Sequence, residues 1–149
     1  MPTRDRLFAY GTILDNPQDA QVQAAITRYT DIIDAAFVPG RLYDLGGYPG
    51  GVPLLTGKEQ QSHWIYGQIL EIIDSSRVFK VLDAYEDADL NHPKAGLYRR
   101  EKIAVTPMND PENPLTCFIY WINKVPPYSH RIEDGNWLNY TKRKADVKI

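Results

Sequence analysis

Apolar residues gather along the chain in short segments, and this pattern predicts several β-strands separated by a few helices. The predicted strands are rich in β-branched or aromatic residues and are bounded by glycine, proline, asparagine or aspartate. The longest of them is expected to bend at Pro39-Gly40. The predicted strands cover residues 7–10, 31–45, 64–73, 98–105 and 116–122.

Helices are predicted where apolar residues recur at helical spacing behind a capping residue. Asp15-Asn16-Pro17 can begin a helix over residues 17–26, because proline suits a first helical turn. Asp74-Ser75-Ser76 can cap a second helix that runs to about residue 85, and a short third helix begins near Asp134.

Glycines and prolines interrupt the chain between these elements. Residues 46–51 contain four glycines and one proline, so we predict a wide turn without regular structure there. Many short strands need their edges closed, and helices separate some of them. We therefore expect an α+β fold in which a small mixed β-barrel carries a few flanking helices.

Glu86 follows the second predicted helix, on the face that also carries Phe79 and Leu82. A carboxyl group thus lies where apolar packing is expected, near a helix C-terminus whose dipole disfavours negative charge. Partial burial adds a desolvation penalty, and both effects raise the pKa of a carboxyl group toward the range of a useful general base. The alternative is a solvated helix end, since three aspartates lie within three residues of Glu86.

The end of the first strand offers a second candidate site. Gly11 follows Tyr10 directly, and glycine allows a ligand to approach the free backbone N–H groups at a strand end. Such a loop can bind a carboxylate or a carbonyl oxygen. The alternative is an ordinary strand end without a ligand.

Composition limits the classes of function. The 149 residues are 43% hydrophobic and 24% charged, as expected of one folded domain over residues 1–149. The net charge of −2, with a single short basic cluster, gives no face for nucleic acid. No segment approaches the ~18 apolar residues of a membrane span. Cys117 is the sole cysteine and excludes an internal disulfide, so a cytoplasmic location is expected.

Several common catalytic groups have no counterpart in the sequence. The three histidines, His63, His92 and His130, are far apart and have no partners at metal-ligand spacing. Cys117 lies in an apolar strand, which is typical of a core residue. We therefore expect no metal and no cofactor, and acid/base chemistry on a substrate that brings its own reactive group. Intramolecular cyclisation is one such reaction.

Short motifs in a fixed order extend over most of the chain, from about residue 7 to residue 140. Together they resemble the γ-glutamylcyclotransferase-like family. The motifs are Leu7-Phe8-Ala9-Tyr10-Gly11-Thr12-Ile13, Gly40-Arg41-Leu42-Tyr43-Asp44-Leu45-Gly46 with Tyr48-Pro49-Gly50, Tyr66-Gly67-Gln68-Ile69-Leu70, Leu82-Asp83-Ala84-Tyr85-Glu86, Tyr98-x-Arg100 and Gly135-x-Trp137.

The resemblance implies a barrel enzyme that acts on a small γ-glutamyl compound and releases 5-oxoproline, without a cofactor. Glu86 would be the catalytic base, taking a proton from the substrate's α-amino group. The loop Tyr10, Gly11, Thr12 and Ile13 would bind the γ-glutamyl group through backbone N–H groups. Tyr48 and Tyr98 are expected to line the same pocket. The list of expected site residues is Glu86, Tyr10, Gly11, Thr12, Ile13, Tyr48 and Tyr98.

The sequence departs from the family pattern at two positions. Ile13 stands where leucine is common, and Asp87 stands where glycine is frequent. Asp87 adds a charge that could raise the pKa of Glu86 or point to water. Two alternatives to an enzyme stay open: a non-catalytic small-molecule binding or interaction module on the same barrel, and an unrelated barrel with a structural Tyr-Gly-Thr turn.

Overall fold

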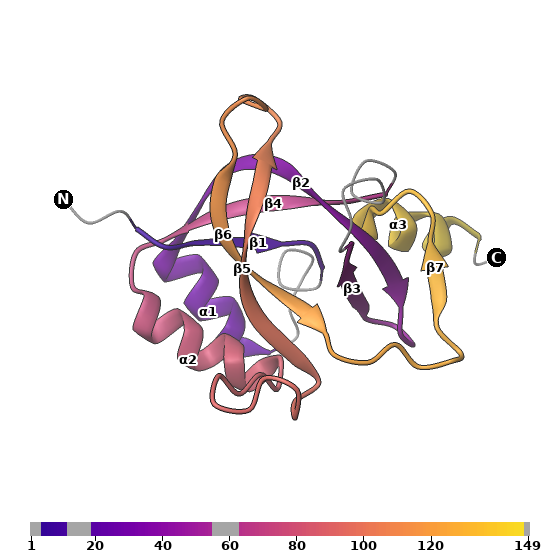
Figure 1. The fold of residues 1–149 in the computed structure, drawn as a ribbon, viewed down its shortest axis with the longest axis horizontal. Helices are drawn as coiled ribbons and strands as arrows, with labels where there is room; N and C mark the ends of the chain where they lie inside the picture. The colour runs from indigo at the N-terminus through magenta and orange to yellow at the C-terminus, as the bar shows by residue number, and fades with distance from the viewer. Residues whose placement is uncertain (1–3, 12–18, 55–62, 148–149) are drawn as a thin grey trace.

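Five strands curl into a closed barrel, shown in Figure 1 for a computed structural model that describes residues 4–11, 19–54 and 63–147. The barrel strands are β1 (Arg6–Ala9), β2 (Thr30–Asp44), β4 (Trp64–Ile72), β5 (Tyr98–Pro107) and β6 (Leu115–Ile122). Their order is β2-β4-β1-β6-β5, and β5 pairs again with β2 to close the barrel. The pairs are antiparallel except β1 with β6, which run parallel. The predicted α+β fold with a small mixed barrel is confirmed.

The longest strand, β2, takes part in two pairings in succession. It pairs with β4 as far as Pro39 opposite Trp64, and beyond that point with β3 (Pro49–Pro53) and β7 (His130–Ile132). The position at which we predicted a bend is therefore the point at which β2 exchanges its partners, and the strand continues through it. β3 and β7 extend the barrel sheet at one end (Figure 1).

The wide turn predicted over residues 46–51 is only half correct. Gly46 and Gly47 form a tight turn with positive φ angles of 121° and 107°, and the Asp44 carboxylate accepts hydrogen bonds from both of their N–H groups. From Pro49 onward the chain is strand β3. Proline and glycine are tolerated there because β3 lies at the edge of the sheet, and among the described residues it pairs only with β2.

The described part of the chain has three helices. Two of them pack side by side against the barrel, and the third lies near β7 (Figure 1). The first helix begins at Ala20, because Asp19 is its N-cap, and it continues beyond the predicted end at residue 26. The predicted start at Asp15-Asn16-Pro17 lies outside the residues that the structure describes. The second begins at Ser75 with Asp74 as its cap, as predicted. The third begins at Trp137, three residues after the predicted start. The bounds are α1 (Ala20–Tyr29), α2 (Ser75–Tyr85) and α3 (Trp137–Val147).

Strand β1 and the residue that follows it contribute to two separate cores. Leu7 and Ala9 join the cluster formed with α1 and α2, whereas Phe8 and Tyr10 join the cluster inside the barrel. Successive side chains of a strand point to opposite faces, so a strand buried on both faces is apolar throughout. This explains the continuous apolar run from residue 7 to residue 10. Cys117, 1% exposed, packs inside the barrel as predicted.

Candidate functional site

Glu86 lies at the C-terminal end of α2 and is its C-cap residue. The buried side chains of Phe79 and Leu82 hold this face of the helix against the core, as the helical spacing predicted. The Glu86 N–H donates to the Leu82 carbonyl at 2.8 Å, so its backbone still follows the helix. Burial raises the pKa of the Glu86 carboxyl group from 4.5 to about 8. Glu86 is therefore a carboxyl group that can exchange a proton near neutral pH.

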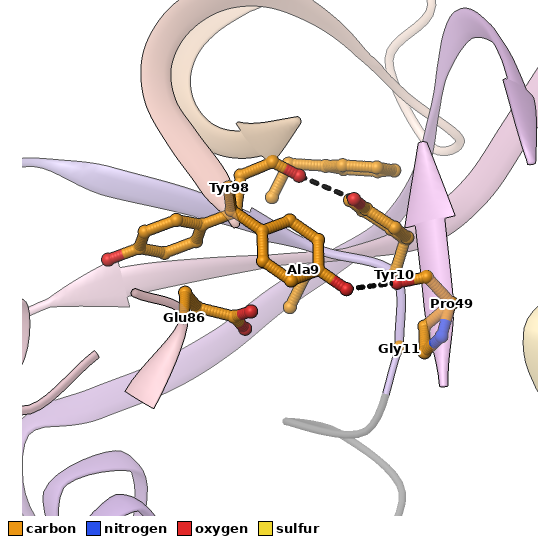
Figure 2. A pocket seen from close by; sticks show the side chains of 8 residues that line it. Ala9, Tyr10, Gly11, Pro49, Glu86 and Tyr98 are labelled. Atoms are coloured by element: carbon orange, nitrogen blue, oxygen red, sulfur yellow. Dashed lines mark hydrogen bonds between the residues drawn. The ribbon is translucent and has the colours of Figure 1, made fainter. Parts of the chain in front are cut away.

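The carboxyl group of Glu86 faces a small pocket (Figure 2). The cavity measures about 30 Å³, which is room for about one or two water molecules. Figure 2 shows Tyr10, Gly11 and Pro49 on the side opposite Glu86, with Tyr98 between them. The lining residues are Phe8, Ala9, Tyr10, Gly11, Pro49, Glu86, Tyr98 and Tyr120.

The structure brings four of the expected site residues together in this pocket: Tyr10, Gly11, Glu86 and Tyr98. Tyr48 is 36% exposed and does not line it. Thr12 and Ile13 lie outside the residues that the structure describes.

Two tyrosines fix the wall of the pocket through their hydroxyl groups. The Tyr10 hydroxyl donates to the Tyr120 carbonyl oxygen and accepts from the Gly51 N–H at 3.0 Å. The Tyr98 hydroxyl donates to the Pro49 carbonyl oxygen at 2.5 Å. Burial raises the pKa of both hydroxyls above the usual value, so both remain neutral donors. These tyrosines hold β3 against the barrel, and each donates its hydroxyl proton in a hydrogen bond to a backbone carbonyl oxygen.

Gly11 lies directly against Pro49. A Cβ atom at Gly11 would lie 2.3 Å from the Cγ of Pro49, which is too close for any side chain. Gly11 does not adopt a positive φ. The requirement for glycine at this position therefore comes from the contact with β3, and the backbone conformation places no such demand.

Asp87, which departs from the family pattern, adopts a positive φ of 53°. Glycine reaches this region without strain, which explains why it suits the position, and aspartate is one of the residues that tolerate it. The Asp87 Oδ2 accepts a hydrogen bond from the Leu97 N–H at 3.1 Å. The charge of Asp87 is thus directed toward the backbone at the end of the α2–β5 loop, and burial alone accounts for the raised pKa of Glu86.

Four residues around Glu86 were not among the predicted site residues. Pro49 and Tyr120 supply the carbonyl oxygens that the two tyrosines contact. Asp83 and Arg100 form an ion pair beside the pocket, with Nε to Oδ1 at 3.0 Å. Both were part of the motifs quoted above, and Asp83 precedes Glu86 by three residues, which puts the two on one helix face. The three-residue spacing between Asp83 and Glu86 was the sequence signal that could have identified Asp83.

The described residues, 4–11, 19–54 and 63–147, offer no group of three or more His, Cys, Asp or Glu that could hold a metal ion. Within the same part of the chain, no helix is both long enough and apolar enough to cross a membrane. Burial raises the pKa of the Cys117 thiol to about 11, so it stays protonated near neutral pH. The titratable group at the pocket with a pKa near neutrality is Glu86.

Comparisons with known proteins agree with this architecture. YkqA from Bacillus subtilis matches with a TM-score of 0.68 and 19% identity over 98% of this chain, which spans only 44% of YkqA. An AIG2-like protein from Mus musculus matches with a TM-score of 0.60 and 20% identity over 85% of this chain and 82% of that protein. A structure described as a gamma-glutamyl cyclotransferase matches with a TM-score of 0.61 and 14% identity over 97% of this chain and 88% of its own.

These identities are low, and the likeness to solved structures establishes the shared fold. No curated protein matches the sequence significantly. The sequence model of the family described as gamma-glutamyl cyclotransferase, AIG2-like, matches residues 7–139 and thus nearly the whole chain. The chain belongs to the gamma-glutamyl cyclotransferase, AIG2-like family.

Proposed function

We propose that this protein is a γ-glutamylcyclotransferase that converts the γ-glutamyl group of a small γ-glutamyl amide into 5-oxoproline and releases the amine. The observation that carries the proposal is Glu86, a carboxyl group whose pKa burial raises to about 8, facing a pocket at the end of β1. Membership of the family supports the same activity. A cytosolic setting belongs to the proposal, since the single cysteine forms no internal disulfide.

Glu86 acts as general base in the first step. Its carboxylate takes a proton from the α-ammonium group of the substrate, and the freed amine attacks the γ-carbonyl carbon. A new C–N bond closes the five-membered ring, and the bond between the γ-carbon and the leaving nitrogen breaks. The protonated Glu86 then returns its proton to the leaving nitrogen, and the released amine takes up the second proton, which the ring nitrogen loses as it becomes the lactam N–H. A carboxyl group with a pKa close to the working pH is suited to both transfers.

The loop Tyr10, Gly11, Thr12 and Ile13 is the part of the proposal that binds the γ-glutamyl group. Gly11 lines the pocket and offers its backbone without a side chain in the way. A cavity of about 30 Å³ can take the reacting amine, while the rest of the substrate extends out of it. Tyr98 lines the same cavity, whereas Tyr48 does not and has no role in this proposal.

The proposed chemistry needs no added group. Holding the amine and the carbonyl of one substrate in attacking geometry can supply roughly 7–11 kcal/mol of the barrier. Positioned proton transfer typically contributes about 10²–10⁴-fold, and one backbone donor to the oxyanion about 10²–10³-fold. The side chains and backbone of the pocket can provide all three effects.

The test is the formation of 5-oxoproline by the purified protein, measured by mass spectrometry. The substrates are a panel of γ-glutamyl amino acids, γ-glutamyl amines and glutathione, and the Glu86→Gln variant is the control for contaminating activity. We expect 5-oxoproline and the free amine in equal amounts from at least one substrate. A ligand that binds without any turnover would instead support the non-catalytic binding module.

A further inference from the structure

Asp83 and Arg100 form a two-point ion pair between α2 and β5. Arg100 Nε donates to Asp83 Oδ1 at 3.0 Å, and Arg100 Nη2 donates to Oδ2 at 3.1 Å. The Arg100 side chain is only 8% exposed, and the Asp83 side chain is 20% exposed. A planar fork of this kind fixes orientation as well as distance. It therefore determines how the last turn of α2 sits on the barrel.

Two aromatic rings fix the arginine in turn. The guanidinium carbon of Arg100 lies 3.9 Å from the centre of the Phe79 ring and 4.8 Å from that of Phe118. Phe79 belongs to α2 and Phe118 to β6, and the two rings meet edge to face at 4.9 Å. Arg100 is thus held by the same helix and the same barrel wall that form the pocket.

Tyr120 connects this ion pair to the pocket. Its hydroxyl donates to Asp83 Oδ1 at 2.7 Å, and its backbone carbonyl accepts from the Tyr10 hydroxyl. Asp83 therefore takes three hydrogen bonds, two from β5 and one from β6. Because Asp83 and Glu86 are three residues apart on one helix face, an anchor on Asp83 also sets the place of Glu86.

We propose that Asp83 and Arg100 are positioning residues, whose two-point ion pair holds the Glu86 carboxyl group in the pocket and away from water. Only the kinetic consequence of this positioning role rests on the proposed function. The pair also keeps the local charge balanced, since each member neutralises the other. Tyr10, Tyr98 and Tyr120 are the titratable side chains that line the pocket together with Glu86, and all three are neutral phenols.

The decisive variant is Arg100→Lys, which keeps the positive charge and removes the fork. Lysine can make one contact with Asp83 but cannot reproduce both. If the fork positions Glu86, water reaches its carboxyl group and its pKa falls from about 8 toward the ordinary value of about 4.3. A ¹³C NMR titration of the glutamate carboxyl carbons, assigned with Glu86→Gln, measures this in the free protein.

The kinetic readout is taken at about pH 9, where Glu86 is ionised in both proteins and its protonation state no longer differs. We expect kcat of Arg100→Lys to fall by about tenfold to a hundredfold, because a displacement of about 1 Å can cost that much. KM should change much less, since the binding loop is intact. A loss confined to KM would contradict the proposal.

The matched control is Arg77→Lys on α2, the helix that carries Asp83. Arg77 pairs with Asp74 at 3.2 Å near the start of α2 and is largely exposed. This control should leave both the Glu86 pKa and kcat unchanged. An Arg100→Lys protein that behaves like Arg77→Lys would overturn the proposal.

A second variant serves if Arg100→Lys does not fold. Tyr120→Phe removes one hydrogen bond to Asp83 and keeps the ion pair, so it should lower the Glu86 pKa in the same direction by a smaller amount. An unchanged Glu86 titration in this variant counts against the anchor. A wild type that forms no 5-oxoproline would contradict the proposed function alone, because the titration tests the positioning without turnover.

Discussion

The hydroxyl of Tyr98 in β5 donates a hydrogen bond to the carbonyl oxygen of Pro49 in β3 at 2.5 Å. In the part of the chain that the structure describes, β3 pairs only with β2, so this bond joins the other side of an edge strand to the barrel. Tyr98 is only 5% exposed, so the bond lies inside the protein. The pocket wall therefore depends on a bond between two segments that share no strand pairing.

Replacing Tyr98 by phenylalanine should lower the stability of the protein. The change leaves the buried Pro49 carbonyl without its partner, which costs about 1–3 kcal/mol. Urea denaturation followed by circular dichroism measures the free energy of unfolding. The control is Tyr128→Phe, a position 76% exposed, where the change should stay within about 0.5 kcal/mol. Equal stability of the two variants would show that the Tyr98 bond contributes nothing.

Replacing Glu86 by glutamine should strongly lower turnover and leave ligand binding intact. Glutamine preserves size and hydrogen bonding but cannot accept a proton near neutral pH. We expect kcat to fall by about 10²–10⁴-fold with little change in the dissociation constant of a γ-glutamyl compound. Steady-state kinetics and calorimetric titration separate the two quantities. A variant with full kcat would refute Glu86 as the base.

The rate of the wild-type enzyme should rise with pH. Glu86 must be ionised to accept a proton, and burial raises its pKa to about 8. The value of kcat/KM, which reports groups of the free enzyme, should therefore increase across neutral pH with an apparent pKa near 8. An acid limb centred near the ordinary value of about 4.3 would mean that burial does not act on the catalytic group.

The Glu86→Gln substitution should also make the protein more stable, and this gain in stability should grow as the pH rises. The folded state holds a proton on Glu86 up to about pH 8, whereas the unfolded chain releases it near 4.5. The folded state thus binds more protons between these values, and stability is lost as pH rises through them. Glutamine carries no such penalty. Since one pKa unit corresponds to about 1.4 kcal/mol, the gain should reach on the order of 2–4 kcal/mol near pH 8 and nearly vanish at about pH 4.

Urea denaturation of wild type and Glu86→Gln at several pH values between these limits tests the stabilisation. Glu112→Gln, at an exposed position, is the control and should show no pH-dependent gain. A gain for Glu86→Gln that is the same at every pH would contradict a buried, protonated Glu86.

A side chain at Gly11 should disrupt the pocket by displacing Pro49. In Gly11→Ala the new Cβ would lie 2.3 Å from Pro49 Cγ, so β3 or the end of β1 must move. We expect loss of ligand binding and a lower melting temperature. Pro49→Ala removes the atom that clashes, so the double variant should recover part of the melting temperature. Failure of the second change to help would place the effect of Gly11 elsewhere.

Much of the barrel could be predicted because its strands carry the alternation and residue types of buried sheet. β4 and β6 begin and end within one residue of their predicted limits at 64–73 and 116–122. β3 and β7 were missed for physical reasons. β3 consists of residues that disfavour strands in isolation, and β7 has only three residues, so both are strands because β2 offers them partners.

The candidate site, too, could be predicted from the sequence only in part. Helical spacing alone predicted that Glu86 lies on the buried face of α2, because Phe79 and Leu82 lie on the same face of that helix. The contribution of Pro49 depends on how β3 pairs, and that of Tyr120 on how β6 meets β1. No local pattern records pairings between segments so far apart. The roles of Asp83 and Arg100 were hidden for the same reason, since one lies on a helix and the other on a strand.

The parallel pairing of β1 with β6 has a consequence for how the protein acquires its pocket. The Tyr10 hydroxyl donates a hydrogen bond to the carbonyl oxygen of Tyr120, which lies 110 residues later in the sequence. Two distant parts of the chain therefore meet at one wall of the cavity. During synthesis β1 leaves the ribosome long before its neighbour β6 exists, and the barrel stays open on that side. Such distant contacts form late and slow the folding reaction. The nascent protein can therefore have helices and a partial sheet, but it has no place for a ligand until its sixth strand has emerged.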